Sequence, residues 1–190
     1  VCSSDLPFDE ASGCFEMLDL PTGFLMISRA ALERMLAQGA PALVSVMLAN
    51  NETGVIQPVA EVAALAKKYN AWVHTDAVQA LGKIPVDFTA LGVDFMTLSA
   101  HKCGGPVGVA ALVARRHLPV QPLMSGGGQE MGRRAGTENL AAIAGFAAAL
   151  GETWDGKPLR GWLDAMERQL EAHGAVVFGK QAPRLPNTSC

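Results

Sequence analysis

The chain has 190 residues, 49% of them hydrophobic, so it is long enough to bury a core of ordinary domain size. A formal net charge of −3 offers no basic surface to a nucleic-acid backbone, and we expect no nucleic-acid partner. No apolar run is long enough to span a membrane; the longest, residues 140–150, is alanine-rich and predicts a buried helix. The four cysteines are scattered, which argues against a disulfide framework or a metal site and favours the reducing cytoplasm.

The first half of the chain alternates predicted helices with short apolar runs. Continuous apolar runs predict parallel strands covered on both faces, and a capping residue or a proline before a periodic segment predicts a helix. In chain order the predicted elements are a helix from Ser28 to Gly39, a strand over 43–49, a helix from Pro58 to Lys68, a strand over 71–75 and a strand over 93–98. Strands joined by such crossovers predict an α/β fold whose sheet is mostly parallel, with helices on both faces.

The second half extends the sheet and then changes character. The predicted elements are a strand over 107–113, helices over 138–152 and 159–173, and the start of a strand over 175–178. Glycine and charge mark residues 126–137 as loops. We therefore expect a leader over 1–40, a large sheet domain over 41–153 and the beginning of a small α+β domain over 159–190.

Polar side chains stand where three of the predicted strands end. Asn51, Asp76 and Lys102 occupy these positions, and an open parallel sheet binds its ligands beyond the carboxyl ends of its strands. We expect the three side chains to converge, with the Lys102 amine held in a pocket among apolar neighbours, a setting that favours a nucleophilic amine. Taken alone, Lys102 could also be an exposed lysine after a strand, and Asp76 could cap a helix.

A lysine and a carboxylate at neighbouring strand ends suit pyridoxal 5'-phosphate. Its aldehyde needs an amine such as Lys102, and its ring nitrogen needs an acid partner such as Asp76. Gln79 follows Asp76 by three residues and could donate to the ring hydroxyl. Ser99 and His101 flank the same strand end and could donate to the phosphate.

Four motifs occur together in the sequence: Asn50–Gly54, His74–Gln79, Ser99–Lys102 and the glycine- and arginine-rich stretch Gly126–Thr137. Their combination and order resemble the class V aminotransferase-fold cysteine desulfurases, in the branch that serves nitrogenase and general iron–sulfur cluster assembly. The resemblance covers about residues 41–190. It implies the large domain of the fold type I pyridoxal-phosphate transferases, a homodimer, and conversion of L-cysteine to L-alanine with a protein-bound persulfide. Sulfur-acceptor or iron–sulfur scaffold proteins would be the partners.

The resemblance also implies a role for each matching residue. Lys102 would hold the cofactor's aldehyde, Asp76 would pair with its ring nitrogen, and Gln79 would bond its ring hydroxyl. The remaining implied contacts are Ser99 and His101 with the phosphate, Asn51 with the cofactor and the substrate carboxylate, and Thr137 with the phosphate in the neighbouring subunit. Lys102, Asp76 and His101 are the predicted catalytic residues.

Some of the family's pattern is not recognisable in this sequence. The family has a phosphate-binding loop and a ring-stacking histidine upstream, and a nucleophilic cysteine and an arginine downstream. We therefore expect a fragment that does not catalyse the reaction by itself. Cys103 directly follows the lysine and is expected to be structural, as are His74 and Glu52. The alternatives are a related class V lyase or aminotransferase, such as a selenocysteine lyase, and a non-catalytic scaffold.

Overall fold

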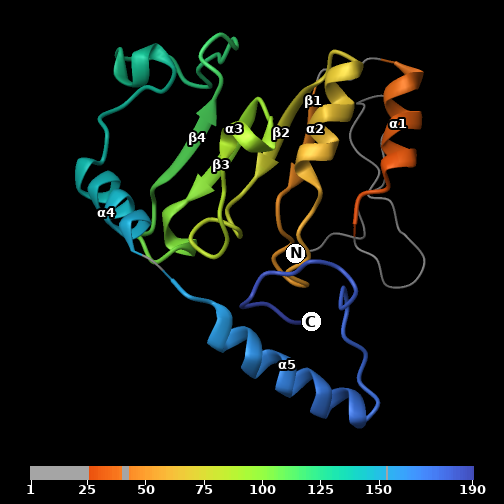
Figure 1. Cartoon of the computed structure of the whole chain (residues 1–190). Coiled ribbons are helices and arrows are strands. Elements are labelled where there is room, and N and C mark those ends of the chain that lie inside the picture. The colour runs from red at the N-terminus through yellow and green to blue at the C-terminus, as the bar shows by residue number, and fades with distance from the viewer. Residues whose placement is uncertain (1–25, 40–42, 153) are drawn as a thin grey trace.

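The structure, a computed structural model, describes residues 26–39, 43–152 and 154–190 (Figure 1). Its centre is a four-stranded sheet in the order β1-β2-β3-β4, formed by Leu43–Met47, Trp72–Asp76, Phe95–Ser99 and Ala110–Ala114. β1, β2 and β3 are parallel, and β4 is antiparallel to β3. β4 reverses direction because the turn that joins it to β3 is too short for a crossover. The mostly parallel sheet with helices that the sequence predicts is confirmed.

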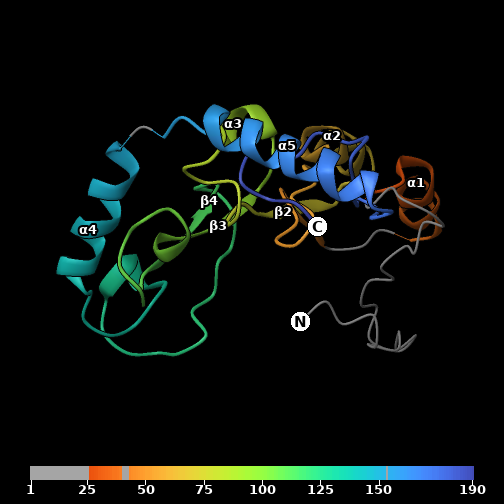
Figure 2. The same cartoon turned by 90° about the horizontal axis from the view of Figure 1, so that it is seen from below.

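Three helices lie on the same side of this sheet: α1 (Arg29–Gln38), α2 (Val59–Lys68) and α3 (Phe88–Leu91) (Figure 2). Ser28 caps α1 by accepting a hydrogen bond from the Ala31 N–H at 3.3 Å, as the sequence predicts. α2 packs against β2, and α1 and α3 each pack beside α2. The core between helices and sheet is apolar, and its fully buried members include Val59, Val73 and Val93.

Burial alternates along the strands. In β1 the side chain of Val44 is 2% exposed, whereas its neighbour Leu43 is 40% exposed. Trp72 in β2 is also 40% exposed, beside Val73 at 0%. The expectation that strand 43–49 is covered on both faces is therefore wrong for the described residues, because α2 packs on the sheet and α1 and α3 lie beside it on the same side.

The helix α4 (Leu140–Gly151) lies beyond the edge strand β4 (Figure 2). Its two buried residues are Ala142 and Phe146, while Leu140 is 73% exposed. The prediction of a buried helix over 140–150 is therefore wrong, because in the described structure only the side of this helix that carries Ala142 and Phe146 is buried. No helix within the described ranges has both the length and the apolar character needed to cross a bilayer.

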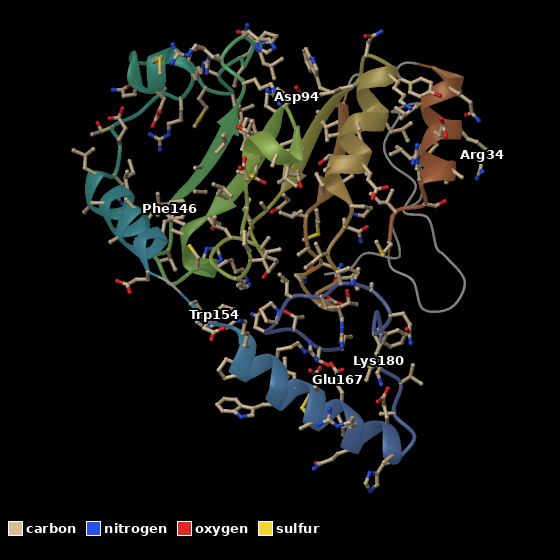
Figure 3. All side chains as sticks on the ribbon, in the orientation of Figure 1. Arg34, Asp94, Phe146, Trp154, Glu167 and Lys180 are labelled. Carbon is tan, nitrogen blue, oxygen red and sulfur yellow. The ribbon has the colours of Figure 1, made fainter. Side chains whose placement is uncertain are left out.

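The helix α5 (Lys157–Ala172) confirms the helix predicted over 159–173. Its Glu167 points toward the C-terminal segment (Figure 3) and is 3% exposed. The strand predicted over 175–178 is absent from this described stretch. The backbone there pairs with the chain end instead, where the Phe178 N–H donates to the Cys190 carbonyl at 2.9 Å.

The C-terminal segment returns to the turn that follows β1. The Leu185 N–H donates to the Gly54 carbonyl at 2.8 Å, and the Ile56 N–H donates to the Pro183 carbonyl at 2.8 Å. Leu185 itself is 0% exposed. Most of the predicted leader over 1–40, and the linker residue Thr153, lie outside the described residues.

Candidate active site

Two neighbouring strands bring the predicted site residues to one edge of the sheet. Asp76, the last residue of β2, lies opposite Thr97 in β3. The Ala77 N–H donates to the Thr97 carbonyl at 3.0 Å, which fixes the exit from β2 against β3. A one-turn 3₁₀ helix, η1 (Ala100–Lys102), follows β3 directly. Asp76 and the turn that carries Lys102 therefore lie at the same end of adjacent parallel strands, as expected.

The Asp76 carboxylate is partly occupied by its own turn. Its Oδ1 accepts a hydrogen bond from the Val78 N–H at 2.9 Å, a two-residue spacing typical of an Asx turn. The capping role that the sequence offered as an alternative for Asp76 is therefore present, in a turn rather than a helix. This bond engages Oδ1 and restrains the orientation of the carboxylate.

Ser99 and His101 lie together at the start of η1. The Ser99 Oγ is 2.8 Å from the His101 Nδ1, so the two side chains form one polar pair. The turn behind them is tight: the Gly105 N–H donates to the Ala100 carbonyl at 2.9 Å, and a Cβ at Gly105 would lie 2.9 Å from the Ala100 Cβ. Only glycine fits that position without displacing the turn.

Lys102 and His101 are both exposed in the structure. The pocket of apolar neighbours expected around the Lys102 amine is therefore not formed by the described residues. The physical reason is its position, because η1 continues past the end of β3, where Ala100 is the buried residue of the turn. Cys103 behaves as the structural residue that was expected, with its Sγ 3.3 Å from the Ala100 carbonyl oxygen.

Gln79 lies in the turn after Asp76 and has a partner that sequence reasoning missed. The Lys83 Nζ donates to the Gln79 Oε1 at 3.0 Å. Burial lowers the pKa of Lys83, and the positive charge of Lys102 lowers it further, while Cys103 acts in the opposite direction. The available sequence signal was the four-residue spacing between Gln79 and Lys83, which places both side chains on the same side of a helical turn.

His74 is held on both sides of its ring. Its Nδ1 is 2.7 Å from the Ser45 Oγ, and its Nε2 is 3.3 Å from the Thr97 Oγ1. Burial lowers the pKa of His74, and the nearby negative charge of Asp76 opposes this shift. Both ring nitrogens of His74 are within hydrogen-bond distance of hydroxyl groups, as we expect of a structural histidine.

Asn51 and Thr137 lie on other segments of the chain than the residues at the ends of β2 and β3. Asn51 is exposed in the turn after β1, where the neighbouring Asn50 Oδ1 accepts from the backbone N–H groups of Glu52 and Thr53, both at 2.9 Å. Thr137 is exposed in the segment that leads from β4 to α4 (Figure 1). The Arg134 Nη1 shapes that segment by donating to the Gly136 carbonyl at 2.8 Å.

The chain is similar in sequence and in structure to known proteins. A protein of Cereibacter sphaeroides named cysteine desulfurase is 48% identical over 153 residues, which are 78% of this chain and 40% of that protein. The solved NifS-like protein from Rickettsia africae is 39% identical with a TM-score of 0.80, and the match covers 86% of this chain and 48% of that one. SspA, solved in complex with cysteine, is 29% identical with a TM-score of 0.66 over 75% of this chain and 42% of its own.

The chain spans about 40% of the length of the curated relative. The family match itself runs over residues 23–155, most of the chain, and includes both strands that end at the candidate site. On that match, the chain belongs to the aminotransferase class-V family.

Proposed function

We propose that the protein containing this chain is a pyridoxal-phosphate-dependent cysteine desulfurase. It would convert L-cysteine to L-alanine and pass the sulfur to acceptor or iron–sulfur scaffold proteins. The observation that carries the proposal is the placement of Asp76, Ser99, His101 and Lys102 at one end of two adjacent parallel strands. The cysteine desulfurase name of the relative that is 48% identical supports the choice of substrate.

The donor set at these strand ends fits the cofactor. Asp76 offers a carboxylate whose orientation is restrained by the Val78 N–H. The Ser99 and His101 pair combines a hydroxyl and an imidazole, and the donor that is not used within the pair, the Ser99 O–H or the His101 Nε2–H, can bind a phosphate oxygen. Lys102 is an exposed amine that an aldehyde can reach. When bound, pyridoxal phosphate supplies an electron sink for bonds at the substrate's α-carbon.

Each residue then has a defined task. The Lys102 Nζ would hold the cofactor's aldehyde covalently. The Asp76 carboxylate would keep a proton on the ring nitrogen, since a negative charge beside that nitrogen stabilises its protonated form. Ser99 and His101 would bind the phosphate, and the Gln79 amide would bond the ring hydroxyl.

Asn51 and Thr137 would complete the site in a cytoplasmic homodimer. Asn51 would lie beside the cofactor and the substrate carboxylate, and Thr137 would reach the phosphate bound by the partner subunit. The exposure of the segment around Thr137 supports this assignment, with Met131 at 92% and Met124 at 71% exposed. Large apolar side chains that protrude from a loop are typical of surfaces covered by another chain.

Borohydride reduction of the cofactor-loaded complete protein, followed by peptide mapping, tests the attachment site. We expect the label on Lys102, and none on Lys102→Ala. The same preparation should release sulfide from L-cysteine in the presence of dithiothreitol. Label on Lys67, Lys68 or Lys83, or activity on another amino acid with none on L-cysteine, would contradict the proposal.

A further inference from the structure

The turn after β2 packs directly against the turn that carries Lys102. Gly82 has φ +75°, and a Cβ built there would lie 2.9 Å from the Cys103 Cβ. The two backbones therefore meet with no room for a side chain between them. Gly82 is followed immediately by Lys83, so this contact brings Lys83 to the neighbourhood of Lys102.

The hydrogen bond between Lys83 and Gln79 fixes the orientation of an amide. An ammonium group has only donors, so the Gln79 atom at 3.0 Å from the Lys83 Nζ must be the amide oxygen. With that oxygen engaged by a cation, Gln79 is oriented to offer its N–H₂ group to other partners. A ring hydroxyl or phenolate oxygen is an acceptor that such a donor fits.

The charges around Lys83 come from two elements. Lys102 and Cys103, at the end of η1, both act on its titration. On its other side Lys83 lines an open cleft together with the charged residues Asp155, Lys157, Arg160 and Asp164. In that cleft Arg160 is paired with Asp164 at 2.6 Å. Lys83 thus lies between the candidate site and the start of α5.

We propose that Lys83 is a positioning residue of the Lys102 site: its ammonium orients the Gln79 amide and places a second positive charge beside Lys102. This inference rests on the proposed function, in which Gln79 contacts the cofactor that Lys102 holds. Lys83 itself touches neither cofactor nor substrate. Its effect reaches the site through one hydrogen bond and through the electrostatic potential at the neighbouring amine.

The first test is a pH titration of the visible absorbance of pyridoxal phosphate bound to the complete protein. Loss of a neighbouring positive charge favours the protonated form of the Lys102 nitrogen that holds the cofactor. Lys83→Met should therefore raise the midpoint of the absorbance titration by about half a pH unit. Lys83→Arg should restore it, because the charge and a donor return. Lys68→Met, at an exposed lysine that ends α2, should leave it unchanged. An unchanged midpoint in Lys83→Met overturns the electrostatic part of the inference.

The second test is a double-mutant cycle on the dissociation constant of pyridoxal phosphate. Lys83→Met should weaken binding by about threefold to tenfold in the unmodified protein, and by less than about twofold in Gln79→Ala. Equal losses in both backgrounds would show that Lys83 does not act through Gln79. Lys83→Gln repeats both measurements if the methionine variant does not fold.

The results that contradict the proposed function differ from those that contradict only this inference. If the unmodified protein binds no cofactor, both fall. If it binds the cofactor at Lys102 and the Lys83 variants behave like the unmodified protein, only the inference falls.

Discussion

Glu167 is the most strongly bonded side chain of the C-terminal part of the chain. Its two oxygens accept hydrogen bonds from Arg160, Arg184 and Ser189 at 2.6 to 3.0 Å. Hydrogen bonding by Arg184 is the largest cause that lowers the pKa of Glu167 to about 2, and burial works against it. A buried carboxylate held in this way stabilises the fold only while it stays charged.

Glu167→Gln should therefore destabilise the chain at neutral pH. The gap between the ordinary value of 4.5 and a pKa of about 2 corresponds to about 3 kcal/mol of unfolding free energy. Because the folded-state pKa is depressed, this contribution is fully present above pH 4.5 and is lost as the pH falls toward 2. Urea unfolding across this pH range should show that the unfolding free energies of the unmodified protein and of Glu167→Gln converge at low pH. The exposed Glu152→Gln serves as a control. A constant difference would contradict the assignment.

Asp76→Asn separates binding from chemistry in the proposed enzyme. The amide keeps an oxygen that can accept from the Val78 N–H, so the turn should survive and the cofactor should still bind. The negative charge that holds a proton on the ring nitrogen is lost, however, and turnover should fall by about 100-fold or more. Sulfide release and cofactor absorbance, measured on the same samples, check both halves. Near-normal turnover would remove Asp76 from the mechanism.

At the scale of single residues, the sequence predicts which side chains stand at strand ends, but it does not predict which charged side chains meet in the folded chain. Asp76, Ser99 and His101 could be placed because each stands at the end of an apolar run, and parallel strands bring such ends together. Lys83 and Glu167 look like solvated charges in the sequence. The four-residue spacing indicates Gln79 as a partner of Lys83. The approach of Lys83 to Lys102 and of Arg184 to Glu167, however, depends on which turn or segment packs there, and a linear pattern does not contain that information.

At the scale of elements, apolar runs predicted the four strands of the sheet but did not predict which faces are covered. A run such as 43–47 is compatible with burial on both faces, yet Leu43 and Ser45 are exposed in the described structure. The alanine-rich α4 gave the same error, since alanine is compatible with both exposed and buried helices. Coverage depends on where neighbouring elements pack, whereas the strand itself depends on local composition.

Gly82→Ala should reveal how closely the turn after β2 packs on the Lys102 turn. Gly82 and Gly108 both have positive φ, +75° and +80°, so alanine should cost each about 1 kcal/mol of backbone strain. Only at Gly82 would the new Cβ also meet a neighbour, the Cys103 Cβ at 2.9 Å; at Gly108 nothing lies within 4 Å. Urea unfolding should show Gly82→Ala losing about 1 kcal/mol more than Gly108→Ala. Equal losses would mean that the turns are not in contact.

At the scale of the whole molecule, the C-terminal segment is attached to the sheet domain through its backbone. Residues 175–178 have strand-like composition but no neighbouring strand to join within the described structure, so the predicted strand does not form. The hydrogen bonds of residues 183–185 go instead to the turn at Gly54, and an isolated bridge pairs Val55 with Arg184. The segment thus supports the same turn that carries Asn51.

Leu185→Ala tests whether this attachment stabilises the molecule as a whole. Leu185 is 0% exposed, and truncating a buried leucine typically costs about 2–5 kcal/mol of unfolding free energy. We expect a loss in that range by urea unfolding, and no change for Leu123→Ala, whose side chain is 99% exposed.

Hydrogen exchange locates the effect of the same substitution. The Ile56 N–H donates to the Pro183 carbonyl, so its exchange should accelerate in Leu185→Ala by more than global destabilisation alone explains. The Val73 N–H, which donates to the buried Asp94 Oδ2 at 2.9 Å, lies inside the sheet and serves as the internal reference. If both amides accelerate equally, the segment and the sheet open as one unit. Acceleration at Ile56 alone means that the segment detaches first and exposes the turn that bears Asn51, which the proposed function places beside the substrate.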